Sequence, residues 1–392
     1  MATPPRVVWS PALLDYDFGP WHPMAPLRLD LTFRLARELG VLDTAEVVGA
    51  ELASDEVLGY AHDPAYVAAV RRAAATGAPD EARGLGTDDV PLFSGMHEAA
   101  ARTVAGSVES ALAVWNDAMG HAVNLSGGLH HAMPDRASGF CIYNDAVAAI
   151  RAVLDAGARR IAYVDLDAHH GDGVEHAFWD DPRVLTISVH ESGHTLFPGT
   201  GQSADIGGSG APGTAVNVAL PAGTGDAGWL RAVASVALPV ISAFGPEMVV
   251  SQHGCDAHGL DPLANLAVSV DAQRAAAAAV HAMTHELCGG RWLALGGGGY
   301  AIAQVVPRAW THLLAIAAHA PVDLAVRVPA AWREHVFREL GFAGPAVMGD
   351  GVHPLPVLQD GPLDLGDPAD RAILATRRAV FPLHGLDPEP VP

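Results

Sequence analysis

A glycine-rich run, DLDAHHGDG at 165–173, concentrates carboxylates and imidazoles at a spacing that suits a metal ion. Asp167 and His169 are two residues apart, so at the end of an extended strand their side chains point the same way. A carboxylate and an imidazole on one side form half of a site for a divalent ion. Asp256, which ends the run SQHGCD at 251–256, can supply a third ligand. Three protein ligands and an open fourth position are typical of a catalytic metal.

The alternative is that these residues serve only turns and helix caps, since Asp and Gly favour loops. For Asp256 taken alone, the two interpretations stand equal. For the whole 165–173 run, the metal interpretation is favoured.

A second cluster, SGGLHH at 126–131, places two adjacent histidines after a Gly-Gly turn. If the metal already has three ligands, His130 and His131 are free for proton transfer. Histidine suits that task because its unperturbed pKa lies close to physiological pH. The remaining carboxylates, Asp165 and Asp172, could orient the two imidazoles.

A third cluster, LGGGGY at 295–300, lets the backbone approach a ligand closely. A phosphate cradle is disfavoured, because neither a Gly-Lys-Ser/Thr ending nor dinucleotide spacing is present. A tyrosine hydroxyl beside a metal could donate to a developing oxyanion, although a tyrosine such as Tyr300, taken alone, is more often a core residue. Gly139-Phe140 and Phe197 are aromatics in glycine loops, which could wall a narrow slot or simply pack.

Short apolar runs alternating with amphipathic ones must position these clusters. The predicted strands are His121–Leu125, Arg160–Val164, Val184–Val189, Met248–Ser251 and Trp292–Leu295. The predicted helices are Met96–Ala118, Asn144–Ala156, Ala227–Phe244, Asp271–Leu287 and Ala303–Ala317. This pattern predicts an α/β fold: a single open, mostly parallel β-sheet flanked by helices. Each polar cluster follows a predicted strand. His190 likewise follows the third predicted strand, Val184–Val189. Because open α/β sheets bind ligands outside the carboxyl ends of their strands, the clusters should converge.

We expect the whole chain, residues 1–392, to form one domain, with a core at about 6–320. Thr76–Gly95 reads as a long surface loop, and Pro239 should kink or divide its helix. The proline-rich extension at about 343–392 shows little helical pattern, so we expect it to wrap over the body or to be partly mobile. The apolar stretch Leu230–Ser251 is better explained by a helix and a buried strand than by a membrane span.

The composition narrows the class of protein. Half of the residues are hydrophobic, the mean hydropathy is +0.21 and the net charge is −21, so the chain is not disordered and lacks the basic surface that nucleic acid requires. Three cysteines cannot form a disulfide framework and suit a reducing compartment. Met1–Asp17 carries no secretory signal pattern. We therefore expect a cytoplasmic protein that binds neither nucleic acid nor membrane.

A binuclear ureohydrolase of the arginase type is the nearest competing interpretation, because that class also uses Asp-Ala-His at a strand end. That pattern continues as Asp-Ala-His-X-Asp, with a later Asp-X-Asp. Here Asp167-Ala168-His169 is followed by His170 and Gly171, and Asp256-Ala257-His258 lacks the final aspartate. Half of the second metal's ligands are missing, so a single transition metal is favoured.

The chain resembles the histone deacetylase superfamily, and within it the bacterial acetoin-utilisation deacetylases. The resemblance covers roughly residues 6–320, in order. The matching motifs are DFGPWHPMAPLRL (17–29), GLGTDDVPLFSGMHEA (84–99), SGGLHHA (126–132), SGFCIYNDAV (138–147), VDLDAHHGDGVEHAF (164–178), SVH (188–190), FPGTG (197–201), QHGCDAH (252–258) and GGGGY (296–300).

The resemblance implies an arginase/deacetylase-like fold and a role for each matching residue. Zn²⁺, or Fe²⁺ in some conditions, would be bound by Asp167, His169 and Asp256. His130 and His131 would be the catalytic pair, backed by Asp165 and Asp172 respectively, and Tyr300 would bind the substrate carbonyl and then the oxyanion. The remaining implied residues are Gly139, Phe140, Phe197 and Leu263 for the acyl-lysine tunnel, Asp88 or Asp89 for the rim, Arg28 for an acetate channel, and Asp165, Asp167, His169, Ser188 and Val189 for a structural K⁺.

The implied reaction is hydrolysis of an acetyl group from N-ε-acetyl-lysine, with His131 as base, giving acetate and a free amine. The substrate stays open between acetylated protein lysine and an acetylated polyamine or other small amide. A metal-bound regulatory protein without activity is the non-enzymatic alternative, which the complete set of site residues disfavours. The sequence makes no prediction of the oligomeric state.

Overall fold

The computed structural model describes residues 4–116, 120–352, 357–358 and 360–389, and its centre is one parallel sheet. Within these residues eight strands pair in the order β2-β1-β3-β8-β7-β4-β5-β6, and every neighbouring pair is parallel. The strands are β1 (Arg6–Val8), β2 (Glu46–Val48), β3 (His121–Asn124), β4 (Ile161–Asp165), β5 (Val184–Glu191), β6 (Ala215–Leu220), β7 (Met248–Gln252) and β8 (Trp292–Leu295). The predicted α/β fold with an open, mostly parallel sheet is confirmed.

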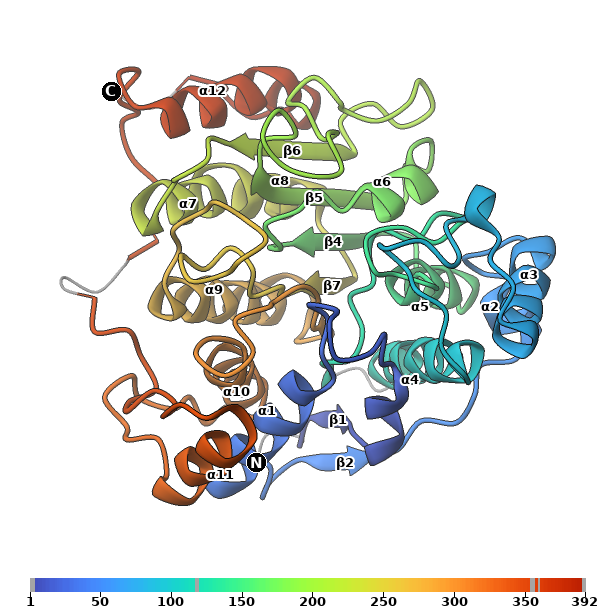
Figure 1. Cartoon of the computed structure of the whole chain (residues 1–392). Helices are drawn as coiled ribbons and strands as arrows, with labels where there is room; N and C mark the ends of the chain where they lie inside the picture. The colour runs from blue at the N-terminus through green and yellow to red at the C-terminus, as the bar shows by residue number, and fades with distance from the viewer. Residues whose placement is uncertain (1–3, 117–119, 353–356, 359, 390–392) are drawn as a thin grey trace.

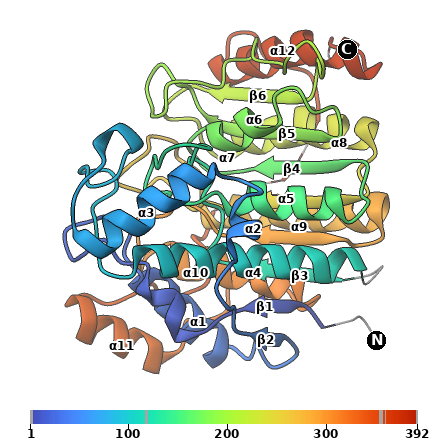
Figure 2. The same cartoon turned by 90° about the vertical axis from the view of Figure 1, so that its right-hand side faces the viewer.

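Helices cover both faces of this sheet (Figures 1 and 2). The α-helices are α1 (Leu27–Glu38), α2 (Asp55–Leu58), α3 (Pro64–Thr76), α4 (Met96–Asn116), α5 (Asp145–Asp155), α6 (Asp172–Phe178), α7 (Asp226–Ala232), α8 (Leu238–Phe244), α9 (Val270–Cys288), α10 (Val306–Ala317), α11 (Ala330–Leu340) and α12 (Pro368–Val380). Residues of α2 to α6 pack in one hydrophobic cluster, and those of α1, α7 to α10 and α12 pack in another.

The strands divide their side chains between these two clusters because successive residues of a strand point to opposite faces. In β4, Ile161 and Tyr163 join the cluster of α4 and α5, whereas Ala162 and Val164 join that of α9 and α10. All of β4 is buried. A strand covered on both faces needs a continuous apolar run, which is the pattern that predicted it.

The carboxyl ends of the strands meet on one side of the molecule. In Figure 2 the arrowhead of β4 points left, so the loops that follow the strands gather at the left of that view and toward the viewer in Figure 1. The loops after β3, β4, β7 and β8 all start there, because these four strands are neighbours in the sheet. The predicted convergence of the polar clusters on one edge therefore has its physical basis in this strand order.

The predicted elements agree with the structure at the centre of the sheet and fail at its edges. The five predicted strands correspond to β3, β4, β5, β7 and β8, whereas β1, β2 and β6 were not predicted. The predicted helix Met96–Ala118 corresponds to α4, and residues 117–118 lie outside the described residues. The segment Thr76–Gly95 is a loop apart from the last residue of α3 and a short 3₁₀ turn at Glu81–Arg83.

The apolar stretch before β7 is divided, as Pro239 predicted. A π-helical turn at Val233–Ala237 separates α7 from α8, which carries Pro239 in its first turn. Within the described residues, Asp226–Phe244 is the one helical stretch long and apolar enough to cross a membrane by length and composition. Its residues Leu230, Val236 and Ile241 are buried in the hydrophobic core, which accounts for its apolar character.

The prediction of little helical pattern in the 343–392 extension was wrong for α12. That helix packs against β6, with Ile373 and Val380 buried in the core. Asp367 caps it by accepting a hydrogen bond from Ala369 N, and Pro368 occupies its first position. An aspartate followed by a proline is a helix start, so the signal was present in the sequence. Residues 353–356, 359 and 390–392 of the extension lie outside the described residues.

Asp350 connects this extension to the core. Its carboxylate accepts hydrogen bonds from Val270 N (2.7 Å) and His258 Nε2 (2.9 Å), and it lies 2.8 Å from the guanidinium of Arg308. Although burial opposes the charge, His258 and Arg308 hold the pKa of Asp350 well below its usual range. The carboxylate therefore contributes more stability when it is ionised.

We expect Asp350→Asn to lower the free energy of unfolding by about 2 kcal/mol at pH 7, the usual range for hydrogen bonds to a charged group. The Asp350 carboxylate has a lower pKa in the folded protein than in the unfolded chain, where it is about 3.9. Its full contribution to the free energy of unfolding is therefore present above about pH 3.9, and it is lost as the pH falls toward the folded-state pKa. Chemical denaturation of both proteins at several pH values measures this difference. Equal stability at pH 7 would contradict the prediction.

Candidate metal and proton-transfer site

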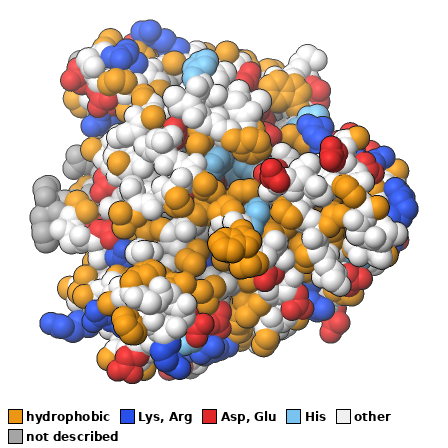
Figure 3. Space-filling view, in the orientation of Figure 1, with side chains coloured by type: hydrophobic (Ala, Val, Ile, Leu, Met, Phe, Trp, Pro, Cys, Tyr) orange, Lys and Arg blue, Asp and Glu red, His pale blue; other side chains and the backbone are white. Residues whose placement is uncertain are grey.

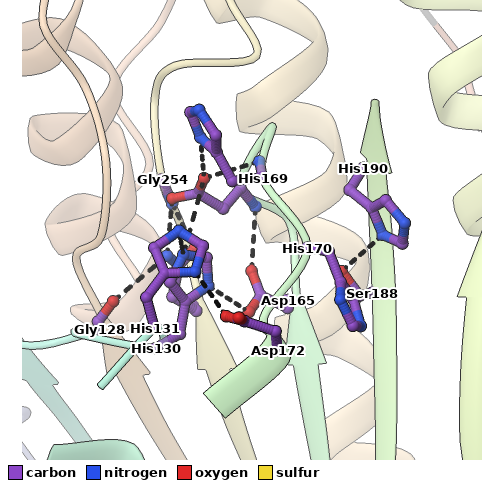
Figure 4. Close-up of polar contacts among 12 residues, drawn as sticks. Gly128, His130, His131, Asp165, His169, His170, Asp172, Ser188, His190 and Gly254 are labelled. Atoms are coloured by element: carbon purple, nitrogen blue, oxygen red, sulfur yellow. Dashed lines mark hydrogen bonds and ion pairs between the residues drawn. The ribbon is translucent and has the colours of Figure 1, made fainter. Parts of the chain in front are cut away.

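Four loops at the carboxyl edge of the sheet bring the predicted polar residues together (Figure 4). Asp165 is the last residue of β4, and Asp172 is the first residue of α6. The other residues lie on the loops between elements: His130 and His131 after β3, Asp167 and His169 after β4, Asp256 after β7, and Tyr300 after β8. All of them except Tyr300 and Asp172 are buried.

Three side chains converge with metal-ligand spacing. Asp167, His169 and Asp256 each offer one ligand atom, and these atoms lie within 4.8 Å of one another. His169 Nδ1 is 3.1 Å from an oxygen of Asp167 and 3.0 Å from an oxygen of Asp256. Two hard carboxylate oxygens and one borderline nitrogen suit a divalent transition ion.

The charges at this group also fit a cation. Asp167 and Asp256 are essentially inaccessible to solvent, and no described arginine forms an ion pair with either. Burial, together with the charge of Asp167, raises the pKa of Asp256 to about 7. Two buried carboxylates this close are costly to ionise together, and a divalent ion between them would remove that cost.

The two adjacent histidines form a second, fully buried pair. His130 Nδ1 lies 2.7 Å from Asp165, and His131 Nδ1 lies 2.7 Å from Asp172. Their Nε2 atoms face each other at 3.0 Å. Because each Nδ1 donates a hydrogen bond to a carboxylate, the Nε2 atoms are left as the titrating positions of the pair.

The two imidazoles have opposite tendencies toward protonation. Burial alone would lower the pKa of His130, but the charges of Asp165 and Asp167 outweigh it and raise the pKa to about 9. For His131, burial and the charge of His130 lower the pKa to about 4, despite the contact with Asp172. The two Nε2 atoms therefore share one proton, which is on His130, and His131 stays neutral and able to accept another.

Tyr300 faces a small cavity beside these groups. The cavity holds about 20 Å³, room for one water molecule, and its walls include His130, His131, Asp167, His169 and Tyr300. Burial raises the pKa of Tyr300 well above its usual value, so its hydroxyl stays protonated and can donate. The backbone N–H of Tyr300 donates to Asp261 (2.7 Å), which fixes the loop that carries the ring.

Two aromatic side chains pack against residues that line this cavity. The Phe140 ring packs edge-on against Tyr300 at 5.7 Å, and the Phe197 ring packs edge-on against His131 at 5.0 Å. Phe197 is 48% exposed, so one side of its ring remains free. Figure 3 shows histidine side chains in a hollow on this face, with hydrophobic side chains around it.

The other predicted substrate residues take distinct positions. Gly139 lines the cavity, and its N–H donates to the carboxylate of Asp89 (2.7 Å). Asp88 is exposed, whereas Asp89 is half-buried. Leu263 is half-buried and is not among the cavity residues, but its N–H donates to Asp261 (3.0 Å), the carboxylate that also binds Tyr300 N.

Arg28 is a buried residue of α1 that contacts the glycine run 296–299, which precedes Tyr300. Its Nη1 donates to the carbonyl oxygens of Gly297 (2.8 Å) and Gly299 (3.3 Å), and its guanidinium lies 5.1 Å from the Trp310 ring. No described carboxylate forms an ion pair with Arg28, so its buried positive charge is met only by the carbonyl oxygens of Gly297 and Gly299.

Three of the five predicted potassium ligands lie on the adjoining strands β4 and β5. Asp165 and Ser188 are register partners on β4 and β5, and Val189 follows Ser188. His190 lies within β5 and not after it, because the strand continues to Glu191. Its ring bonds to Ser188 Oγ (2.8 Å) and to the carbonyl of Gly201 (2.9 Å), away from the metal group.

Sequence reasoning missed three residues that hold the site in place. Asp145 accepts hydrogen bonds from Gly128 N and Leu129 N, which fixes the turn before the histidine pair. Gln252 Nε2 donates to Asp167 (2.7 Å), and Asp261 orients Tyr300. All three lie within or next to the motifs quoted above, but their contacts to backbone groups and to a ligand oxygen depend on the folded geometry.

Comparison with known proteins agrees with this arrangement. The model of the histone deacetylase domain matches residues 22–317. The acetoin utilization protein AcuC of Bacillus subtilis (strain 168) is 43% identical over 309 residues, 78% of this chain and 80% of that protein. AcuC of Staphylococcus xylosus is 36% identical over the same shares of the two chains.

A solved structure agrees over almost the whole fold. The crystal structure of an HDAC homolog complexed with SAHA covers 96% of this chain and 99% of its own, with a TM-score of 0.79 and 27% identity. Because the family model spans most of the chain and the AcuC relatives match four-fifths of their own length, the chain belongs to the histone deacetylase family and is a deacetylase of the AcuC type.

Proposed function

We propose that this deacetylase is a Zn²⁺-dependent hydrolase that removes the acetyl group from N-ε-acetyl-lysine in proteins and releases acetate. The observation that carries the proposal is the buried Asp167–His169–Asp256 group beside a carboxylate-backed histidine pair, with a water-sized cavity between them. Asp167, His169 and Asp256 would hold the ion. When bound, the ion supplies Lewis-acid chemistry to the amide carbonyl and the attacking water.

The histidine pair moves the protons of the reaction. His131 is neutral and lines the cavity, so its Nε2 accepts the proton of the attacking water. His130 keeps its own proton through Asp165 and stabilises the negative charge that develops beside it. His131 then returns that proton to the lysine nitrogen as the carbon–nitrogen bond breaks, which gives acetic acid and the free amine. The acid passes its remaining proton to the amine, so the products are acetate and the lysine ammonium.

Tyr300 and the mouth residues hold the substrate. The Tyr300 hydroxyl donates to the carbonyl oxygen and holds the oxyanion that forms from it. Gly139, Phe140, Phe197 and Leu263 enclose the aliphatic part of the acyl-lysine. Asp89 is the rim carboxylate, because it touches the Gly139 loop while Asp88 points to solvent. Arg28 attracts the departing acetate, since its charge has no carboxylate partner in the described chain.

We extend the proposal to the wider setting of the enzyme. The structural K⁺ would be held by Asp165, Asp167, His169, Ser188 and Val189, of which Asp165 and Ser188 are register partners. The chain would act in the cytoplasm, since its three cysteines are free and buried. Residues 1–392 would form one catalytic domain, because both hydrophobic clusters share one sheet.

A paired substrate assay tests the proposed substrate. Zn²⁺-loaded enzyme is given an acetyl-lysine peptide or an acetylated polyamine at equal concentration, and acetate is measured. The chain contains no lysine, so the enzyme itself contributes no acetyl-lysine background. We expect the higher kcat/KM on the peptide. Turnover of the polyamine alone would overturn the protein-lysine substrate while leaving the amide chemistry intact.

Gly139→Ala tests the close packing of the tunnel against the histidine pair. A Cβ at Gly139 would lie 2.3 Å from His131 Cδ2, so the imidazole must shift. Because a displacement of about 1 Å can cost 10²-fold, we expect kcat/KM to fall about 10²-fold. Gly77→Ala is the matched control, since Gly77 has a similar φ (66° against 55°) and open space around it. Equal activity of the two variants would contradict the prediction.

A further inference from the structure

Four histidines converge at the end of the sheet opposite the deacetylase site. His121 is the first residue of β3, His281 and His285 lie on α9, and His319 follows α10. Each offers one ring nitrogen, and these four atoms lie within 4.8 Å of one another. Because all strands are parallel, the amino end of β3 lies on the far side of the sheet from His130, to the right in Figure 2.

The spacing of the ring nitrogens is poorly explained by hydrogen bonds alone. His285 Nε2 lies 3.1 Å from His121 Nε2 and 3.2 Å from His281 Nε2. An imidazole nitrogen has one in-plane position, which holds either a proton or a lone pair, so His285 can satisfy only one of these neighbours. Four nitrogens at about 2.0–2.1 Å from a tetrahedral ion lie about 3.3 Å apart, close to the observed contacts.

The orientation of His121 prepares it as a ligand. Its Nδ1 lies 2.8 Å from the carbonyl oxygen of Ala317, a group that can only accept. The ring proton is therefore on Nδ1, and Nε2 directs a lone pair into the cluster. A backbone carbonyl on the second ring nitrogen is the usual support of a metal-bound histidine. His281 and His285 are four residues apart, so they share one face of α9.

The surrounding chain keeps the four rings together. The Trp292 ring packs against His121 at 5.5 Å and against His281 at 5.6 Å. A Cβ at Gly290 would lie 2.9 Å from His285 Cε1, so glycine there leaves the ring its space. His319 has a left-handed backbone (φ 57°), which a non-glycine residue adopts at a cost, and its ring lies 4.7 Å from that of His121.

Two of the four rings, those of His121 and His281, favour the neutral form that binds metals. Burial is the main cause that lowers the pKa of His121 to about 4 and that of His281 to about 3, and neighbouring histidines add to both shifts. Neutral imidazoles suit Zn²⁺, Cu²⁺ and Ni²⁺ better than Mg²⁺ or Ca²⁺, which prefer oxygen. Four neutral imidazoles do not balance the charge of a bound cation, but the net charge of the whole chain, −21, favours cation binding.

We propose that His121, His281, His285 and His319 form a second metal site, which takes a divalent late first-row transition ion and is distinct from the deacetylase site. The ion would join three parts of the chain that are distant in sequence: the start of β3, the last turns of α9 and the turn after α10. Its role is structural, because the cluster lies at the opposite edge of the sheet from His130.

Zn²⁺ stoichiometry tests this site directly. The full chain is stripped with a chelator, reloaded with excess Zn²⁺, gel-filtered and measured by elemental analysis. We expect two ions per chain for the wild type, one for His281→Ala/His285→Ala, one for Asp167→Asn/Asp256→Asn and none for the fourfold variant. The His281→Ala/His285→Ala protein should keep its deacetylase activity, because neither residue belongs to that site.

The outcomes separate this proposal from the proposed function. If His281→Ala/His285→Ala binds as much Zn²⁺ as the wild type, or if Asp167→Asn/Asp256→Asn binds none, the histidine site is overturned, whatever the activity. Electron paramagnetic resonance of Cu²⁺ bound to Asp167→Asn/Asp256→Asn should show couplings to several imidazole nitrogens. If the α9 variant does not fold, His319→Ala, at an exposed turn position, should weaken Zn²⁺ binding to this site at least tenfold, and unchanged affinity would overturn the proposal.

Discussion

We expect His131→Ala to lower kcat/KM on an acetyl-lysine peptide about 10³-fold, within the 10²–10⁴ that a positioned general base contributes. The side chain faces the water-sized cavity, and its Nδ1 is held by Asp172 at 2.7 Å, so Nε2 is the atom that accepts the proton. Burial and the charge of His130 hold its pKa at about 4, so it is neutral and available across the physiological range.

The metal group should survive this substitution, because His131 is not one of its three residues. Metal content and activity are therefore measured on the same samples. His176→Ala, which removes an exposed histidine from α6, serves as the matched control and should retain full activity. A loss smaller than about tenfold in His131→Ala, with metal retained, would assign the base to another group.

The second large effect concerns the oxyanion. Tyr300→Phe should reduce kcat about 10²–10³-fold, the usual cost of losing one preorganised donor. The change removes only the hydroxyl, so the edge-on contact of the ring with Phe140 at 5.7 Å remains. The tyrosine stays protonated because burial raises its pKa, and its backbone is fixed by Asp261. KM should change little, since the hydroxyl acts most strongly in the transition state.

Tyr143→Phe is the matched control for Tyr300→Phe. Tyr143 is buried, and its hydroxyl bonds to His97 Nδ1 (3.0 Å), away from the cavity. Its loss should reduce stability and leave kcat within a few-fold of the wild type. If Tyr300→Phe is as active as Tyr143→Phe, the oxyanion must be held by other donors.

The centre of the fold could be predicted because its strands are continuous apolar runs. β4 and β8 are buried throughout, so their sequences carry an unambiguous pattern. β1 and β2 have only three residues each, too few for a period to show. Helix α12 was missed because its apolar residues alternate with arginines and the surrounding segment is rich in proline, although its Asp-Pro start was visible.

The residue types of the site could be predicted, but not all of its contacts. Clusters that follow parallel strands must meet at one edge, and for that reason the sequence brought His130, Asp167 and Asp256 together. The roles of Asp145 and Asp261 depend on which backbone N–H groups face them. The second histidine cluster joins positions 121, 281, 285 and 319, and only the fold reveals that they are neighbours.

Metal dependence of turnover tests the central claim most directly. The wild type, Asp256→Asn and His281→Ala/His285→Ala are stripped with a chelator, assayed on an acetyl-lysine peptide, then reloaded with Zn²⁺ and assayed again. We predict no turnover in any stripped protein, and recovery in the wild type and in the α9 variant but not in Asp256→Asn. Full turnover of the stripped wild type, or none after Zn²⁺ is bound at Asp167, His169 and Asp256, would contradict a metal-dependent lysine deacetylase.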